Sequence, residues 1–249
     1  MVERVNILEK IAEKTRERIN AKLVDDGADF ENVLKFGGVS FICEVKKASP
    51  SLGVICEDFD YLKIAEEYEA AGASALSVLT EPYYFQGHDR YLSEIGECVK
   101  LPLLRKDFII SEYMIYESKF IGASAVLLIC AILDDAELAS YIKIAGDLGL
   151  AVLVETHDEL EIKRALDCGA EIIGVNNRDL RTFEVDIKLS ERLRRYIPDD
   201  KIFVSESGIK MREDIKRLED IGVHAVLIGE TLMRSEDKKA ELAKLRGMI

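Results

Sequence analysis

The apolar positions of this 249-residue chain fall into short, nearly continuous runs that are separated by longer amphipathic stretches. Eight runs have the length of buried β-strands: Phe41–Val45, Ala75–Leu79, Leu101–Leu104, Ala125–Ile129, Ala151–Val154, Ile172–Val175, Ile202–Val204 and Ala225–Ile228. Helical patterns such as Tyr61–Ala71 and Asp134–Leu148 lie between them. Continuous apolar strands that alternate with amphipathic helices are typical of a parallel sheet covered on its faces.

A repeated glycine motif supports this alternation. The string Gly-Ala-x-Ala or Gly-Ala-x-Ile begins at Gly72, Gly122 and Gly169, and each copy follows an amphipathic segment and precedes an apolar run. Glycine is the residue that most often ends a helix. Eight strand–helix units in about 250 residues favour a (β/α)8 TIM barrel. A doubly wound open sheet is the alternative, but the GxGxxG motif typical of that fold does not follow the first strand. We predict one domain over residues 1–249, with residues 1–35 as an N-terminal helical extension packed on the barrel.

Composition narrows the functional classes. The formal net charge is −13 and the sequence pI is about 4.9, which argues against a nucleic-acid-binding protein because phosphate neutralisation requires a basic face. No run approaches the roughly 20 apolar residues of a membrane span. The N-terminal sequence lacks the apolar core of a secretory signal and carries acidic residues that transit peptides avoid. We therefore expect a cytoplasmic protein with neither nucleic-acid nor membrane partners.

Cysteine and histidine residues form no pattern of a disulfide or metal site. The five cysteines show no CxxC spacing, and several lie in apolar runs, so we expect buried free thiols. The three histidines form no HxH or HExxH pair. We predict that the protein has no metal site.

Charged and polar residues gather where the predicted strands end. Active sites of TIM barrels lie at the carboxyl ends of the strands. The residues at those ends are Glu44, Lys46, Lys106, Glu155, Asn176 and Glu206. Glu44 and Lys46 point to the same side of their strand, and the Glu44 carboxylate in its apolar run needs a partner such as Lys46 or Lys106. Because different strands converge on one rim, we predict a site there.

Two glycine-containing pairs indicate a phosphate position. Ser207-Gly208 follows the seventh predicted strand and Gly229-Glu230 follows the eighth, where barrels commonly bind phosphate. Glycine allows the backbone to approach a ligand closely, and a following helix offers free N–H groups. Lys46 or Ser49 could add a charge or a hydroxyl from the first strand, which neighbours the eighth when the barrel closes.

Seven strings in these regions match one known family. They are Glu44–Ser51 (EVKKASPS), Leu79–Phe85 with Gly87 (LTEPYYF, then G), Leu103–Phe108 (LLRKDF), Leu153–Glu155 (LVE), Ile173–Leu180 (IGVNNRDL), Ser205–Ile209 (SESGI) and Leu227–Arg234 (LIGETLMR). In type and order they resemble the indole-3-glycerol phosphate synthase family over essentially the whole chain, and the N-terminal helical segment matches as well. The resemblance implies a carboxy-lyase of tryptophan biosynthesis. Its reaction closes 1-(2-carboxyphenylamino)-1-deoxyribulose 5-phosphate to indole-3-glycerol phosphate, with loss of carbon dioxide and water.

The resemblance also implies roles for the charged rim. Lys106 matches the family's general acid, which acts on the ribulose oxygen during ring closure, and Glu155 matches the acid/base carboxylate of the later dehydration. Glu44 and Asn176 match residues that orient the substrate and the lysines. Lys46 matches a lysine near the phosphate that has also been given an acid role.

Further matches concern substrate binding. Arg178 matches a residue near the anthranilate carboxylate. Phe85 and Phe108 follow strand ends and fit either the core or the apolar wall that the anthranilate ring requires. The substrate and phosphate positions comprise Ser49, Glu206, Ser207, Gly208, Gly229 and Glu230.

Two positions depart from the family pattern. Ser205 stands where the family often has alanine, and Glu230 stands where some members have serine or threonine. Because a carboxylate would repel phosphate, we expect only the backbone N–H of Glu230 to contact the ligand.

The implied reaction also sets expectations about partners. Loss of the ring carboxylate restores aromaticity, so we expect no cofactor. We expect one small phosphorylated substrate and a monomeric protein, with association with other tryptophan-pathway enzymes as an alternative. The enzymatic alternatives are a phosphoribosylanthranilate isomerase, which would use a cysteine–aspartate pair although Cys43 points away from Glu44, and a Schiff-base aldolase using Lys106. A barrel that binds a phosphorylated ligand without turnover is the non-enzymatic alternative.

Overall fold

The computed structural model describes residues 29–35, 37–179 and 181–248. Within these residues, eight parallel strands close into a barrel: β1 (Ser40–Val45), β4 (Ala75–Leu79), β5 (Leu103–Lys106), β6 (Ala125–Ile129), β7 (Ala151–Thr156), β8 (Ile172–Asn176), β9 (Ile202–Glu206) and β10 (Ala225–Ile228). The last strand, β10, pairs with β1 and completes the ring. The predicted (β/α)8 TIM barrel is therefore confirmed.

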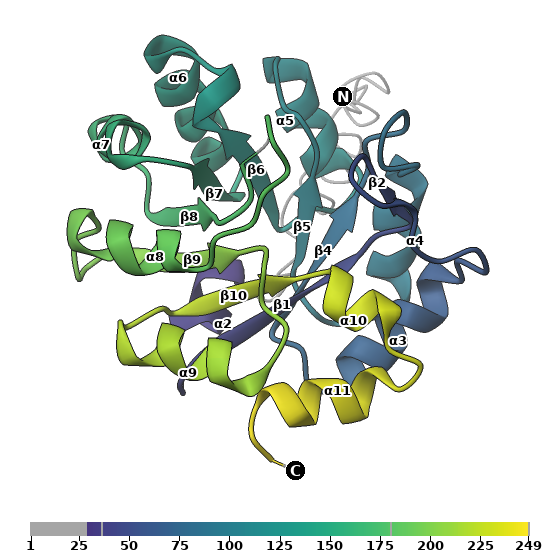
Figure 1. Cartoon of the computed structure of the whole chain (residues 1–249). Helices are drawn as coiled ribbons and strands as arrows, with labels where there is room; N and C mark the ends of the chain where they lie inside the picture. Colours follow the sequence, from purple (N-terminus) through teal and green to yellow (C-terminus); the bar gives the residue numbers. More distant parts are fainter. Residues whose placement is uncertain (1–28, 36, 180, 249) are drawn as a thin grey trace, which may run out of the picture.

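Helices alternate with these strands and surround the barrel (Figure 1). They are α3 (Tyr61–Ala70), α4 (Asp89–Cys98), α5 (Glu112–Phe120), α6 (Asp135–Asp147), α7 (Glu159–Asp167), α8 (Lys188–Leu193), α9 (Arg212–Asp220), α10 (Glu230–Arg234) and α11 (Lys238–Leu245). A short hairpin, β2 (Ala48–Ser49) with β3 (Gly53–Val54), follows β1. Among the described residues, no helix combines the length and the apolar character that crossing a membrane requires.

Most strand boundaries follow the apolar runs, and most of the differences are polar residues that continue a strand at its carboxyl end. The bounds of β4, β6 and β10 are those predicted, whereas β7, β8 and β9 each continue into polar residues at their carboxyl ends. β5 was predicted at Leu101–Leu104 and lies at Leu103–Lys106 instead. Arg105 and Lys106 continue the strand because carboxylates on neighbouring elements pair with both side chains. Hydrophobicity alone does not show such pairing.

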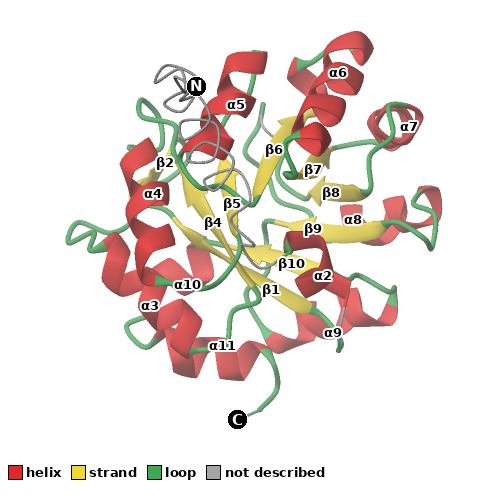
Figure 2. Ribbon diagram, turned by 180° about the vertical axis from the view of Figure 1, so that it is seen from behind, coloured by secondary structure: helices red, strands yellow, loops and turns green. Residues whose placement is uncertain are grey.

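Alternate strand residues fill the barrel interior with apolar side chains. This cluster includes Ile42, Leu104, Leu127, Leu153, Ile172, Val204 and Leu227. Helix α2 (Phe30–Lys35) adds Phe30 and Leu34, which are buried in the same cluster. Figure 2 shows this helix beside β1 and β9. The Ser40 hydroxyl donates to the Val33 carbonyl, which ties α2 to the first residue of β1. The described part of the predicted N-terminal extension thus closes the amino end of the barrel; residues 1–28 lie outside the described residues.

The cysteines only partly follow the prediction of buried thiols. All five are free, and Cys43 and Cys130 are buried, but Cys98 is exposed. Cys43 packs outward against the helices, opposite to Glu44, as the alternation predicted. Burial raises the pKa of the Cys43 thiol to about 12, so this thiol stays protonated near neutral pH.

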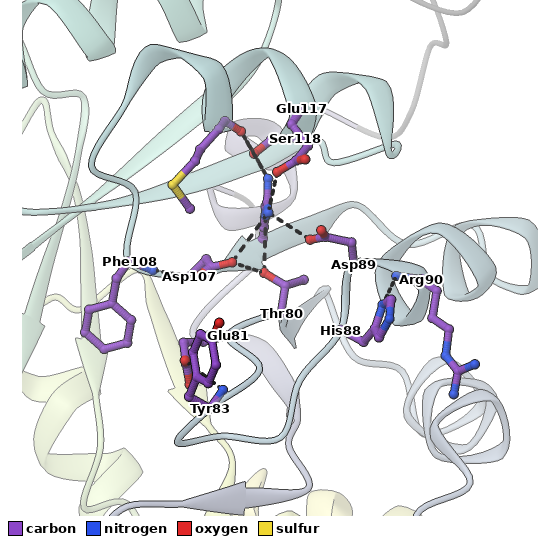
Figure 3. Close-up of polar contacts among 12 residues, drawn as sticks. Thr80, Glu81, Tyr83, His88, Asp89, Arg90, Asp107, Phe108, Glu117 and Ser118 are labelled. Atoms are coloured by element: carbon purple, nitrogen blue, oxygen red, sulfur yellow. Dashed lines mark hydrogen bonds and ion pairs between the residues drawn. The ribbon is translucent and has the colours of Figure 1, made fainter.

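A buried guanidinium on β5 joins two strands and two helices. Arg105 Nη2 lies 2.8 Å from Asp89 Oδ1 of α4 and 2.9 Å from Glu117 Oε2 of α5. Arg105 Nε donates to Thr80 Oγ1, which in turn donates to Asp107 Oδ2 (Figure 3). Arg105 is only 2% exposed, so this network holds the outer side of β5 next to Lys106.

We predict that Arg105→Met lowers the free energy of unfolding by about 3 kcal/mol, because it leaves the buried Asp107 carboxylate without its cation. Urea unfolding followed by circular dichroism measures this loss. Arg192→Met is the matched control: Arg192 pairs with Asp186 at 2.7 Å, but both side chains are more than half exposed. Exposed pairs contribute about 1 kcal/mol or less. Equal losses of unfolding free energy in the two variants would show that the buried network stabilises the protein no more than the exposed pair does.

Candidate active site

The carboxyl ends of the strands surround a cavity of about 800 Å3. Every residue that the sequence predicted for the site lines it: Glu44, Lys46, Ser49, Phe85, Lys106, Phe108, Glu155, Asn176, Arg178, Glu206, Ser207, Gly208, Gly229 and Glu230. Residues from β1, β5, β7, β8, β9 and the segments that follow them therefore converge on one space, as the strand-end pattern predicted.

The charged floor of the cavity lies directly on the apolar interior. Lys106 stands two residues after Leu104 on β5, and Glu206 stands two residues after Val204 on β9. Since side chains alternate along a strand, these charged groups point inward above the apolar layer. The same strand alternation that builds the core thus directs the charges into the cavity.

Lys106 lies among carboxylates at the centre of this floor. Its Nζ is 3.1 Å from Glu155 Oε2 and 3.5 Å from Glu206 Oε2. Beside it, Lys46 Nζ forms an ion pair with Glu44 Oε1, so the predicted partner of the buried Glu44 is Lys46. A side chain at Gly229 would collide with this pair, which explains glycine at that position.

The pKa values of these groups diverge because they share one poorly solvated space. Burial by itself would lower the pKa of Lys106, but the charges of Glu155, Glu206 and Glu44 outweigh it and raise the pKa. Burial raises the pKa of Glu206 to about 7, with Glu155 and Glu44 adding to the rise and Lys106 opposing it. Burial also acts to raise the pKa of Glu155, but Lys106, His157 and Asn176 reverse the effect and lower it. An ammonium, an ionised carboxylate and a more readily protonated carboxyl group therefore stand side by side.

The segment after β9 has an unusual backbone conformation. Ser207 and Gly208 both have positive φ angles, 66° and 83°. A side chain at Gly208 would meet Val185 Cγ1, so the turn requires glycine both for its conformation and for its space. Asn177 holds this segment: its Nδ2 donates to the Ser207 carbonyl at 3.1 Å.

Ser205, the first departure from the family pattern, is fully buried and does not line the cavity. Its hydroxyl accepts from Asn177 Nδ2 at 3.0 Å and lies 2.8 Å from the Ser190 hydroxyl. The serine therefore adds a hydrogen bond behind the site rather than a group within it.

Glu230, the second departure, is held by two guanidinium groups. Arg178 Nη2 lies 3.6 Å from its Oε2, and Arg234 Nε lies 3.4 Å from its Oε1. Arg234 and Lys210 also line the cavity, although the sequence argument assigned a role to neither. The available signal for Arg234 was its spacing of four residues from Glu230, which places both on one side of α10.

Two aromatic rings form an apolar part of the cavity wall. The ring centroids of Phe85 and Phe108 are 6.1 Å apart. Both side chains line the cavity, so they belong to its wall and not to the core. The buried Glu81 carboxylate accepts the backbone N–H groups of Tyr84 at 2.7 Å and Phe85 at 3.0 Å. Glu81 therefore shapes the segment that carries the first ring, and the sequence argument did not single it out.

The described residues contain no cluster of metal-ligating side chains. Over residues 29–248, apart from the undescribed positions 36 and 180, no group of three or more His, Cys, Asp or Glu residues is arranged to hold a metal ion.

Solved structures with the same barrel are named for different activities. A 3-hexulose-6-phosphate synthase from Salmonella typhimurium has a TM-score of 0.70 and 14% identity, covering 84% of this chain and 97% of its own. A mutant tryptophan synthase alpha-subunit from Pyrococcus furiosus has a TM-score of 0.66 and 15% identity, covering 85% of this chain and 99% of its own. At these identities the likeness shows the fold alone.

Sequence relatives are far closer. The family model described as indole-3-glycerol phosphate synthase matches residues 2–245. An indole-3-glycerol phosphate synthase of Ruminiclostridium cellulolyticum is 55% identical over 97% of this chain and 99% of its own length. That of Lachnoclostridium phytofermentans is 47% identical over 98% of this chain and 100% of its own. The family expected from the sequence motifs is thus confirmed: the chain belongs to the indole-3-glycerol phosphate synthases, the decarboxylating lyases of tryptophan biosynthesis.

Proposed function

We propose that the cavity closes 1-(2-carboxyphenylamino)-1-deoxyribulose 5-phosphate to indole-3-glycerol phosphate, with release of carbon dioxide and water. The position of the Lys106 ammonium group supports this proposal most directly. Its Nζ lies 3.1 Å from Glu155 Oε2 and 3.5 Å from Glu206 Oε2, at the floor of the cavity. The phosphate contacts the backbone after β9 and β10, at Ser207-Gly208 and Gly229. The anthranilate ring lies against Phe85 and Phe108 at the other side of the cavity.

Ring closure begins the proposed sequence. The ring carbon that bears the carboxylate bonds to the ribulose carbonyl carbon, and the carbonyl oxygen takes a proton from the Lys106 ammonium. An acid placed in a water-poor cavity stabilises the charge that develops on this oxygen. Carbon dioxide then leaves with its bonding electrons returned to the ring, which restores aromaticity without a cofactor.

Dehydration completes the sequence and requires an acid and a base. The hydroxyl group formed in ring closure is protonated by a lysine ammonium and leaves as water, and Glu155 takes the proton that is lost from the new ring. The lowered pKa of Glu155 keeps it ionised and able to accept this proton. Lys46, already paired with Glu44, is the second ammonium available beside the phosphate end of the cavity.

Binding groups at the rim complete the assignment. Arg178 meets the anthranilate carboxylate, and Glu44 and Asn176 orient the lysines and the substrate. Ser49 of the β2–β3 hairpin adds a hydroxyl near the phosphate. The backbone N–H of Glu230 serves the phosphate while Arg234 holds its carboxylate away.

The same proposal extends to the whole chain. We infer a single domain over residues 1–249 that works as a monomer in the cytoplasm and needs neither metal nor cofactor. The strands close the barrel within one chain, and all the proposed catalytic groups come from that chain.

Lys106→Ala tests the acid directly. We expect turnover to fall by roughly 100-fold or more, the usual scale for loss of a general acid, while the fold persists. Growth of indole fluorescence after mixing with the substrate measures turnover. Lys201→Ala is the control, since Lys201 pairs with Glu171 outside the cavity and its loss should leave turnover unchanged. Near wild-type turnover in Lys106→Ala would show that this lysine is not the acid.

The phosphate position is tested by comparing Gly208→Asp with Gly208→Ala. Both substitutions strain the positive-φ backbone and press on Val185, but only aspartate adds a charge. We expect KM for the aspartate variant to exceed that of the alanine variant by about tenfold or more, or about 1.4 kcal/mol. Equal KM values would place the phosphate elsewhere.

Glu206→Gln should stabilise the protein in a pH-dependent way. The pKa of Glu206 is raised from 4.5 to about 7 by folding, so its favourable contribution exists at low pH and is lost as pH rises to about 7. Above that pH the folded protein holds a buried charge that glutamine removes. Urea unfolding should show a gain of about 1–3 kcal/mol at pH 8 and little change at pH 5. A gain that is the same at both pH values would contradict this assignment.

A further inference from the structure

Behind Glu155, on the side away from Lys106, lies a histidine that the proposed mechanism does not use. His157 Nε2 is 3.4 Å from Glu155 Oε1, and it is buried without a hydrogen-bond partner. Lys106 Nζ approaches the other oxygen, Glu155 Oε2, at 3.1 Å. The Glu155 carboxylate thus stands between an ammonium in the cavity and an imidazole outside it.

A second carboxylate fixes the imidazole. Glu161 Oε2 accepts the backbone N–H of His157 at 2.7 Å and lies 3.1 Å from its Nδ1. The Asp158 carboxylate accepts the backbone N–H of Glu161 at 2.9 Å, which anchors Glu161 in the first turn of α7. With Nδ1 donating to Glu161, the ring is turned so that Nε2 faces Glu155.

We propose that His157, held by Glu161, is a positioning residue that keeps Glu155 ionised and turns its second oxygen toward Lys106. This inference rests on the proposed function, in which Glu155 is the base of the dehydration. A row of alternating charges then runs from the cavity to the outer helix: Lys106, Glu155, His157 and Glu161.

The groups that face His157 are mostly acidic. They are Glu155 on β7, Glu161 on α7 and Glu206 on β9, with Lys106 beyond Glu155. Burial would lower the pKa of His157, but the hydrogen bond to Glu161 and the charges of Glu155, Glu161 and Glu206 raise it overall. The cationic imidazole in turn contributes to the lowered pKa of Glu155. Removing His157 should therefore make Glu155 harder to ionise.

The first test needs no substrate. The chain has only three histidines, so 15N-labelled protein gives three imidazole titrations by NMR, assigned with His88→Asn and His224→Asn. His157 should titrate above the ordinary value of about 6.5. Its midpoint should fall in both Glu161→Gln and Glu155→Gln. An ordinary midpoint that neither substitution moves would overturn the inference, whatever the protein's activity.

The second test is the pH dependence of turnover in His157→Phe, which keeps a ring but no donor, and in His157→Gln, which restores a neutral donor. We expect the acid limb of the kcat profile to move about one pH unit upward in the phenylalanine variant. The loss of kcat should thus be about tenfold larger below the limb than above it. In His157→Gln we expect a similar limb, since the charge is absent, but a higher plateau, since Glu155 is again oriented.

His224→Asn is the matched control for these profiles. His224 accepts the backbone N–H of Phe203 at 3.0 Å near the amino end of the barrel, and its loss should leave the acid limb in place. An acid limb in His157→Phe that coincides with the wild-type limb would overturn the inference. If the wild-type protein does not convert the substrate, the proposed function fails, whereas the imidazole titration still decides the contact between His157 and Glu155.

Discussion

The structure depends above all on one partly buried ammonium, that of Lys106, held among buried carboxylates. Lys106 lies 3.1 Å from Glu155 and 3.5 Å from Glu206, above an apolar interior that offers no solvation. Burying a charge is costly unless an opposite charge accompanies it. The protonation of each of these groups therefore depends on the others, and removal of any one changes the protonation of the rest. The divergent pKa values of Glu155 and Glu206 follow from this shared confinement rather than from any property of glutamate itself.

The barrel supplies the confinement through a simple division of strand positions. Inward-facing residues near the amino ends are apolar, and α2 covers them with Phe30 and Leu34, whereas the last inward positions of β1, β5, β7 and β9 carry charge. Outside the barrel, the Arg105 network holds β5 against α4 and α5, immediately beside Lys106 in the chain. At the end of β7, the His157–Glu161 pair stands behind Glu155. The catalytic rim is thus supported from the helical layer as well as from the core.

Strand alternation explains why so much of the fold and the site could be predicted from the sequence. Apolar runs gave the bounds of β4, β6 and β10 directly, and period-two spacing placed Glu44 with Lys46 on the cavity side. The end of β5 was missed because Arg105 and Lys106 look like residues that follow a strand until their partners on other elements are known. Arg234, Glu81 and His157 were missed for the same reason: their contacts join segments whose proximity only the folded chain reveals.

We propose that substrate and product lie with the phosphate at the β9 and β10 ends and the aromatic ring against Phe85 and Phe108, with the reacting carbon beside Lys106. A crystal structure with bound indole-3-glycerol phosphate tests this arrangement most directly. The account predicts phosphate oxygens within hydrogen-bond distance of the backbone at Gly208 and Gly229, and the indole ring against the two phenylalanines. An indole ring at the glycines, or a ligand bound out of reach of Lys106 Nζ, would contradict it.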